Sequence, residues 1–268
     1  MNMLKWVARN KYKLMPAIAV LLYLAADLWL HKGEARVWWP DNFPVDKNYI
    51  IGPVNRNQLI NSGRQWVQGV NTIEKLNGLP AETNGLECDV YFNLQKGIFE
   101  VHHDPDKYTG LGLDSLLTAY RRKKLAASVW LDFKNLVPAN QQPALTELIR
   151  LRDKFGLQHK LLVESMQADP LAAFSDSGFF TSYYTPLFNP YLNSLQTSGE
   201  WTDSLAAALH RSKADALSGY YFQYPMLKKY FPNYRILTWA TRSRFSLVNG
   251  LFRRKLNNDR GLFIVLYP

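Results

Sequence analysis

The sequence predicts an α/β fold, namely a TIM-type (β/α)8 barrel preceded by an N-terminal transmembrane helix. Eight short apolar runs alternate with stretches of helical periodicity, and most of the runs lack the strict alternation of strands with one face in water. A doubly wound open sheet is the alternative. The chain contains neither a Gly-x-Gly-x-x-Gly fingerprint nor a Gly-x-x-x-x-Gly-Lys loop, which disfavours a nucleotide-binding sheet of that kind.

Composition indicates a folded domain with anionic partners. The chain has 268 residues, of which 47% are hydrophobic and 20% are charged, and its formal net charge is +10. Such a basic excess favours lipid headgroups, phosphoesters or nucleic acid. No RNA- or DNA-binding module signature occurs, so we expect no nucleic-acid partner. The single cysteine excludes an intrachain disulfide and a thiolate zinc site.

The N-terminal segment predicts membrane attachment. Residues 1–13 are basic and residues 14–30 are almost all apolar, which predicts a cytoplasmic N-terminus and a transmembrane anchor. A cleaved signal peptide is the alternative, although Ala25-Ala26 is a poor cleavage site. We expect residues 31–47 to be a linker and residues 48–268 to form a barrel domain that is periplasmic or extracellular.

The barrel elements follow in order along the chain. The predicted strands are Tyr49–Val54, Leu86–Phe92, Val129–Asn135, Leu161–Ser165, Phe179–Thr185, Ala216–Tyr221, Ile236–Ala240 and Leu262–Tyr267. The predicted helices include one that starts at Asp114-Ser115 and others over Gln141–Phe155, Asp203–Arg211 and Phe245–Leu256.

Carboxylates at the ends of neighbouring strands predict a metal site. Alternation along a strand places Glu87 and Asp89 on one face and Cys88 on the other, where Cys88 is expected to pack as a small hydrophobe. The same alternation puts Asp132 and Lys134 on one face of the next strand. These four side chains can converge at the carboxyl end of a barrel, and a set of oxygen ligands suits Mg²⁺ or Ca²⁺. A structural alternative is that Lys134 pairs with the acids.

Other residues would complete this site. His103, in the sequence His102-His103-Asp104-Pro105, would lie beside the cation as a general acid or base. Glu164, Tyr183 and Trp239 end later strands and are candidates for substrate binding.

These motifs resemble those of the glycerophosphodiester phosphodiesterase-like superfamily, which includes PI-specific phospholipase C. The motifs are Glu87-x-Asp89-Val90, His103-Asp104-Pro105 and Leu131-Asp132-Phe133-Lys134, with Leu237-Thr238-Trp239-Ala240-Thr241 near the end. Leu131-Asp132-Phe133-Lys134 and Val54-Asn55 look most like the menorin branch. The resemblance covers about residues 48–268. It implies a TIM-type barrel, a divalent metal on Glu87, Asp89 and Asp132, His103 as one of two catalytic histidines, and Lys134 as a phosphate contact.

The chain departs from this family at the first histidine, which lies at the end of strand one. With strand one at Tyr49–Val54, that place is taken by Gly52 or Pro53, and neither can move a proton. Asn55 and Arg56 would remain at the same end as polar groups, and Arg56 would hold a phosphate.

The sequence therefore predicts a metal-dependent phosphodiester hydrolase that acts on a glycerophosphodiester or a phospholipid headgroup. One alternative is a non-catalytic barrel that binds a phosphorylated ligand at the membrane surface, because one histidine is missing. The other is a polysaccharide-cleaving barrel with Glu87 and Glu164 as its acid and nucleophile, which would leave His103 and Lys134 without a role.

Overall fold

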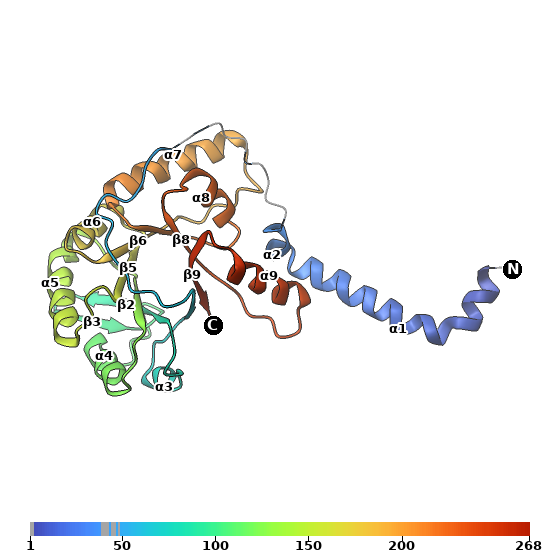
Figure 1. Ribbon diagram of the computed structural model, residues 1–268, viewed down its shortest axis with the longest axis horizontal. Helices are drawn as coiled ribbons and strands as arrows, with labels where there is room; N and C mark the ends of the chain where they lie inside the picture. Colours follow the sequence, from blue (N-terminus) through green and yellow to red (C-terminus); the bar gives the residue numbers. More distant parts are fainter. Residues whose placement is uncertain (1–2, 39–42, 44–46, 48) are drawn as a thin grey trace.

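Eight parallel strands close into a barrel surrounded by helices (Figure 1). A computed structural model describes residues 3–38, 43, 47 and 49–268, with side chains from residue 15 onward. The barrel order is β1, β2, β4, β5, β6, β7, β8 and β9, and the pairings of β1 with both β2 and β9 close it. The bounds of these strands are Gln65–Val67, Gly85–Asn93, Ser128–Phe133, Leu161–Ser165, Phe180–Tyr184, Ala216–Ser218, Arg235–Trp239 and Leu262–Tyr267.

Helices connect the strands, as expected for a TIM-type barrel. Their bounds are α3 Ile73–Asn77, α4 Leu113–Arg122, α5 Pro138–Phe155, α6 Ala168–Asp176, α7 Leu195–Ser212, α8 Tyr224–Tyr230 and α9 Leu247–Asn258. One further strand, β3 (Ile98–Val101), pairs antiparallel with the end of β2 and makes a hairpin. This strand is not among those that the sequence predicts.

The core has two layers that follow the alternation of the strands. Trp66, Trp130, Phe180 and Leu237 belong to a buried cluster inside the barrel. Side chains of opposite parity belong to the larger cluster between strands and helices, and Cys88 is among them, as expected for a small hydrophobe. The alternation predicted for β2 and β4 is therefore confirmed.

The prediction that Tyr49–Val54 forms the first strand is wrong. The first strand is β1, Gln65–Val67, whereas residues 49–54 form no strand. The ring of Tyr49 stacks on Phe231 at 5.2 Å, and Asn233 Nδ2 donates a hydrogen bond to the carbonyl of Ile51. This apolar run therefore packs against the segment that leads into β8, and its apolar character does not come from a place in the sheet.

In the described part of the chain, two helices precede the barrel. Helix α1 spans Met3–Leu30 and projects away from the barrel, and α2 spans Lys32–Arg36 beside α9 (Figure 1). Among the side chains that the structure describes, no helix is long and apolar enough to cross a membrane. The transmembrane anchor over 14–30 and the domain limits stay predictions. Helix α2 falls within the predicted linker, of which residues 39–42 and 44–46 lie outside the described residues, as do residues 1 and 2 of the basic segment.

Candidate functional site

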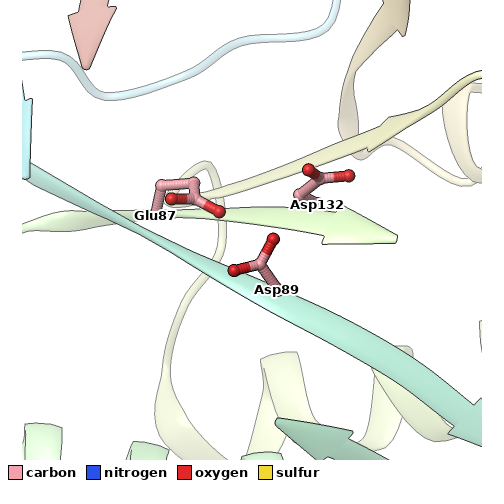
Figure 2. A group of neighbouring side chains, drawn as sticks. All are labelled: Glu87, Asp89 and Asp132. Carbon is pink, nitrogen blue, oxygen red and sulfur yellow. The ribbon is translucent and has the colours of Figure 1, made fainter. Parts of the chain in front are cut away.

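Three carboxylates from β2 and β4 meet at the carboxyl end of the barrel. Figure 2 shows Glu87, Asp89 and Asp132 around a shared space, and one oxygen from each lies within 4.8 Å of the others. The register explains this, because Asp89 lies opposite Asp132 across the β2–β4 pairing, with Glu87 one inward position earlier. Glu87 and Asp89 are only 3% and 4% exposed. The predicted acidic cluster is therefore present.

Lys134 lies within the same cluster, just beyond the end of β4. Its Nζ is 2.8 Å from Asp89 Oδ1 and also contacts Asp132 Oδ2. Three ionised carboxylates and one ammonium would carry a net charge of −3 + 1 = −2. The structural alternative of a lysine pairing with the acids is thus realised, and it leaves a residual charge that one divalent cation would neutralise.

The loop after β1 orients two of the carboxylates. The backbone N–H of Gly69 donates to Glu87 Oε2 at 2.6 Å, and Gly69 adopts φ +66°, a conformation that glycine tolerates best. Asn71 Nδ2 donates to Asp89 Oδ2 at 2.6 Å, while the N–H of Asp89 donates to Asn71 Oδ1. Hydrogen bonds of this kind fix the carboxylate planes, as in the supporting shell of a metal site.

Burial and mutual repulsion alter the protonation of the cluster. Burial, with added repulsion from Asp89 and Asp132, raises the pKa of Glu87 to about 8. Burial also raises the pKa of Asp132, although the ion pair with Lys134 opposes that change. For Lys134, the two carboxylates outweigh burial and raise the pKa. Near pH 7 the site therefore holds a proton that a cation would displace from Glu87.

The two adjacent histidines differ in their surroundings. His103 lines the cavity, keeps 71% of its side chain exposed, and its Nδ1 lies 2.7 Å from Asp104 Oδ1. His102 is 6% exposed, stacks on Tyr91 at 4.3 Å, and its Nδ1 lies 2.7 Å from the carbonyl of Asp104. Of the two, only His103 is placed for chemistry in the cavity.

The carboxylates line one wall of a cavity of about 460 Å³. Glu164 lies opposite Asp132 across the β4–β5 pairing and is 2% exposed. Its carboxylate interacts with the hydroxyls of Ser182 and Ser218, whereas the indole Nε1 of Trp130 has no hydrogen-bond partner among the described residues, and both side chains line the cavity. Buried polar atoms are normally satisfied, so the indole N–H of Trp130 is a candidate for contact with a ligand.

Aromatic rings from three later segments form another wall. Trp239, at the end of β8, lies 4.8 Å from the ring of Tyr220 and 5.4 Å from that of Tyr184. The sequence had indicated Tyr183, which instead belongs to the outer core cluster and does not line the cavity. Tyr183 and Tyr184 are neighbours, so they point to opposite faces of β6, and the inward position falls to Tyr184.

Asn55 and Arg56 lie away from this cavity. Asn55 Nδ2 donates to Ser175 Oγ and Asp176 Oδ1, just before β6, and Arg56 lines a separate cavity. The adjacent Asn57 bonds to Asp215, just before β7. Asn55 and Asn57 therefore lie at the amino ends of the barrel strands. The expectation that Asn55 and Arg56 stand at the carboxyl end is therefore corrected, because it depended on the wrong first strand.

Sequence reasoning missed the residues that follow the true first strand. Gln68, Gly69, Asn71 and Lys75 line the cavity, and Lys75 Nζ donates to the carbonyl of Gln68 at 2.6 Å. Gln68 occupies the end of strand one, so it replaces Gly52 or Pro53 as the residue at that place. One signal was available, since the Val-Asn pair found at Val54-Asn55 occurs again at 70–71, directly after Gly69.

The donor set fits a divalent cation. Glu87, Asp89 and Asp132 offer only oxygen atoms, as Mg²⁺ and Ca²⁺ prefer, and their excess charge has the matching sign and size. His103 is the one histidine among the described residues that line the cavity, so an imidazole-rich transition-metal site is disfavoured.

Comparison with known proteins supports the fold. No family model and no curated protein matches the sequence. A glycerophosphodiester phosphodiesterase from Parabacteroides distasonis matches with a TM-score of 0.55 at 13% identity, over 77% of this chain and 93% of that one. A protein from Silicibacter pomeroyi assigned as a glycerophosphoryl diester phosphodiesterase gives 0.53 at 13% identity, over 79% and 92%.

A third match is the glycerophosphodiester phosphodiesterase from Thermotoga maritima, with a TM-score of 0.50 at 15% identity, over 76% of this chain and 94% of that one. Likenesses at these identities establish the fold. The chain thus has the barrel fold of glycerophosphodiester phosphodiesterases, as the sequence resemblance implied. The closer resemblance to the menorin branch stays a prediction.

Proposed function

We propose that this protein is a divalent-cation-dependent phosphodiester hydrolase. The observation that carries the proposal is the convergence of Glu87, Asp89 and Asp132 with Lys134 in one cavity that His103 also lines. The substrate would be a glycerophosphodiester or a phospholipid headgroup. The barrel shared with glycerophosphodiester phosphodiesterases supports this class of substrate over a polysaccharide.

The charge of each residue in the cavity determines its proposed role. Glu87, Asp89 and Asp132 would hold Mg²⁺ or Ca²⁺, which supplies Lewis-acid stabilisation of phosphate oxygens when bound. Lys134 would share its ammonium group between the carboxylates and a non-bridging oxygen. Glu164 and Trp239 line the cavity beside these groups and are proposed to contact the substrate. Trp239 offers an apolar face to the glycerol or lipid portion.

His103 is the proposed proton-transfer group. Asp104 contacts Nδ1 of His103 and so orients the ring, which leaves Nε2 as the atom that would exchange a proton with the substrate. Lys107, which bonds to Asp104, together with His103 lowers the pKa of Asp104 to about 2. Asp104 therefore stays ionised at neutral pH and favours a proton on Nδ1.

A non-catalytic role in binding a phosphorylated ligand is the second candidate. Gln68 stands at the end of β1, where the resemblance expects a histidine, and an amide cannot act as a general base. Lys134 is paired to two acids, but the cavity would still bind an anionic group through this ammonium group and the proposed divalent cation. The proposed hydrolase therefore depends on His103 alone for proton transfer.

Membrane attachment through α1 remains part of the proposal. The described part of α1 exposes many apolar side chains, among them Leu21 at 65%, Leu22 at 66% and Trp29 at 71%. We expect the full chain to sediment with membranes, to resist extraction by carbonate, and to place the barrel in the periplasm or outside the cell. Recovery in the soluble fraction would contradict this location.

The test of activity uses the full chain in detergent micelles. Bis-p-nitrophenyl phosphate, glycerophosphodiesters and phospholipids are assayed with Mg²⁺, with Ca²⁺ and with chelator. We expect cation-dependent hydrolysis that falls about 10²–10⁴-fold in His103→Ala. His210→Ala, on the exposed face of α7, is the matched control and should leave the rate unchanged. No hydrolysis of any substrate, with cation binding retained, would favour the binding role.

A further inference from the structure

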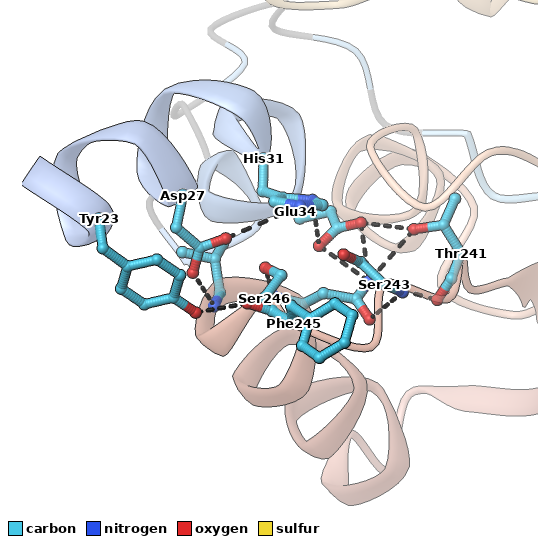
Figure 3. A network of polar contacts seen from close by, with 10 residues as sticks. Tyr23, Asp27, His31, Glu34, Thr241, Ser243, Phe245 and Ser246 are labelled. Carbon is cyan, nitrogen blue, oxygen red and sulfur yellow. Dashed lines mark hydrogen bonds and ion pairs between the residues drawn. The ribbon is translucent and has the colours of Figure 1, made fainter.

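A buried polar network joins α2 to residues 241–251, which contain the β8–α9 loop and the first turn of α9 (Figure 3). Glu34, on α2, is 3% exposed, and its carboxylate accepts hydrogen bonds from Asn249 Nδ2 at 2.9 and 3.1 Å and from Thr241 Oγ1. Asn249 is itself only 1% exposed. A carboxylate removed from water requires such donors, so the network fixes segment 241–251 against α2.

A second buried carboxylate extends the contact to α1. Asp27, which is 5% exposed, accepts a hydrogen bond at 3.1 Å from the backbone N–H of Val248, in the first turn of α9. The N–H groups of a first turn have no partner within their own helix. His31 lies between the two acids, with Nε2 3.7 Å from Asp27 and Nδ1 3.5 Å from Glu34.

Apolar side chains surround this network on the outside. Phe245, Leu247 and Leu251 are 87%, 55% and 52% exposed. The Tyr23 hydroxyl donates to the carbonyl of Phe245, so this apolar surface adjoins that of α1. The exposed apolar side chains of α1 include Met15, Ile18, Val20, Leu21, Leu22, Leu24, Leu28, Trp29 and Leu30.

A shallow cavity of about 210 Å³ lies at the junction, and only apolar residues line it: Leu28, Ala35, Trp38, Val248 and Leu251. Exposed cations flank the apolar side chains, namely Arg242, Arg244 and Arg254. Apolar groups beside arginines are the pattern of a surface that enters the headgroup region of a membrane, where the apolar groups meet acyl chains and the cations meet phosphates.

We propose that segment 241–251 is a lipid-contacting surface, held against α1 and α2 by the Asp27–Glu34 network, that rests on anionic lipid. Tyr23 lies seven residues before the end of α1, which is about 10 Å along the helix. This position lies inside the predicted anchor over 14–30, so the contact of Tyr23 with Phe245 brings the loop alongside the part of α1 that would lie in lipid.

The position of this surface relates it to the candidate site. Segment 241–251 starts two residues after Trp239, which ends β8 and lines the cavity. Contact between this segment and lipid would hold the mouth of the barrel at the membrane, where a lipid headgroup could enter it. The inference rests on the proposed membrane location but not on hydrolysis.

The experiment uses the full chain in nanodiscs that contain phosphatidylglycerol and phosphatidylcholine. A nitroxide spin label is attached to Phe245→Cys, to Leu251→Cys or to Ile60→Cys. Ile60 is 50% exposed next to β1 at the opposite end of the barrel and is the matched control. Cys88 is fully buried and should not react, which the unlabelled wild type checks. We expect oxygen to collide more often than an aqueous nickel complex at positions 245 and 251, with the reverse at 60.

Equal, water-like accessibility at 245, 251 and 60 would overturn the proposal, as would a failure of the chain to associate with nanodiscs. In nanodiscs of phosphatidylcholine alone we expect the oxygen preference at 245 to shrink, and an unchanged value would overturn the role of anionic lipid. Hydrolysis is measured separately on the same samples. Lipid contact without hydrolysis would contradict the proposed hydrolase activity and would support the proposed lipid contact of segment 241–251.

Glu34→Ala tests whether the network holds the segment. Loss of this carboxylate removes the partner of Asn249 and Thr241, so the spectrum of the label at 245 should show faster motion. Glu82→Ala, at an exposed position, is the control and should leave the spectrum unchanged. An unchanged spectrum in Glu34→Ala would mean that segment 241–251 is held by other contacts.

Discussion

Lys134 lies among three closely spaced carboxylates, of which Glu87 and Asp89 are buried and Asp132 is partly exposed. Its ammonium group contacts Asp89 and Asp132. Glu87 instead accepts a hydrogen bond from the backbone N–H of Gly69, and its raised pKa favours the neutral, protonated form. The ammonium group therefore compensates for part of the charge, and the remainder is left for a proton or a cation.

Lys134→Met should lower the free energy of unfolding of the cation-free protein by about 3 kcal/mol, the lower end for a broken buried pair. The lower end applies because Lys134 keeps 24% of its side chain exposed. Urea unfolding in chelator measures the loss, and Mg²⁺ or Ca²⁺ should restore more stability to the variant than to the wild type. Lys107→Met, which breaks the exposed pair with Asp104, is the control. Equal stability of Lys134→Met and wild type would contradict the account.

Cation binding should depend on pH through Glu87. Its pKa of about 8 in the folded protein exceeds its ordinary value of 4.5, so below pH 8 a cation must displace a proton. Affinity should rise about tenfold per pH unit between pH 5 and 8 and then level off. Calorimetric titration in buffers of different ionisation enthalpy measures the proton release.

The same raised pKa fixes the sign of the effect on folding without a cation. The unfolded chain binds fewer protons than the folded one between pH 4.5 and 8, so this group lowers stability as pH rises through that window. Glu87→Gln should remove both the proton release and this contribution. Proton release that persists in Glu87→Gln would assign the proton to another group.

At the scale of elements, the parallel barrel strands after the first could be predicted because their apolar runs coincide with buried positions. Leu161–Ser165 and Leu262–Tyr267 match β5 and β9. Strand β1 escaped detection because it has three residues and only Trp66 among them is buried. The run around Ile51 looked like a strand because it packs on the barrel from outside.

The site could be predicted where two strands were placed correctly and not where one was missed. The alternation of side chains along β2 and β4 correctly predicts that Glu87, Asp89 and Asp132 face the inside of the barrel. Asn71 and Gln68 depend on β1, so sequence reasoning could not find them. The choice of Tyr183 over Tyr184 failed for a finer reason, since the register of β6 decides which tyrosine faces inward, and neither residue type indicates it.

Gly85 shows how tightly β1 and β2 pack inside the barrel. A Cβ at this position would lie 2.0 Å from Cδ2 of Trp66, which is 1% exposed and cannot move outward. Gly85→Ala should therefore lower the free energy of unfolding by about 1–3 kcal/mol through overpacking. Gly112→Ala, whose Cβ would meet a carbonyl at 3.6 Å, should change it little. Urea denaturation compares the two, and equal stabilities would contradict this packing.

At the scale of the whole molecule, the two ends of the barrel have different roles, because one end carries structural hydrogen bonds and the other carries the candidate site. The amino ends of the strands carry Asn57 and Asp215 in hydrogen bonds that close that end. The carboxyl ends carry the acids, His103 and Trp239 around one cavity. Helix α1 is joined to the loop that follows β8 and to the first turn of α9, so the element proposed to meet the membrane is connected to the end that bears the cavity.

The central claim is that the carboxylate cluster performs cation-dependent phosphodiester hydrolysis. The most direct measurement is the rate of bis-p-nitrophenyl phosphate hydrolysis as a function of Mg²⁺ or Ca²⁺ concentration, in wild type and in Asp132→Asn. We predict that the wild-type rate rises to saturation with the cation and that Asp132→Asn loses at least about 10²-fold, because a ligand and its charge are removed. Equal rates in the two proteins, or a rate independent of the cation, would contradict the account.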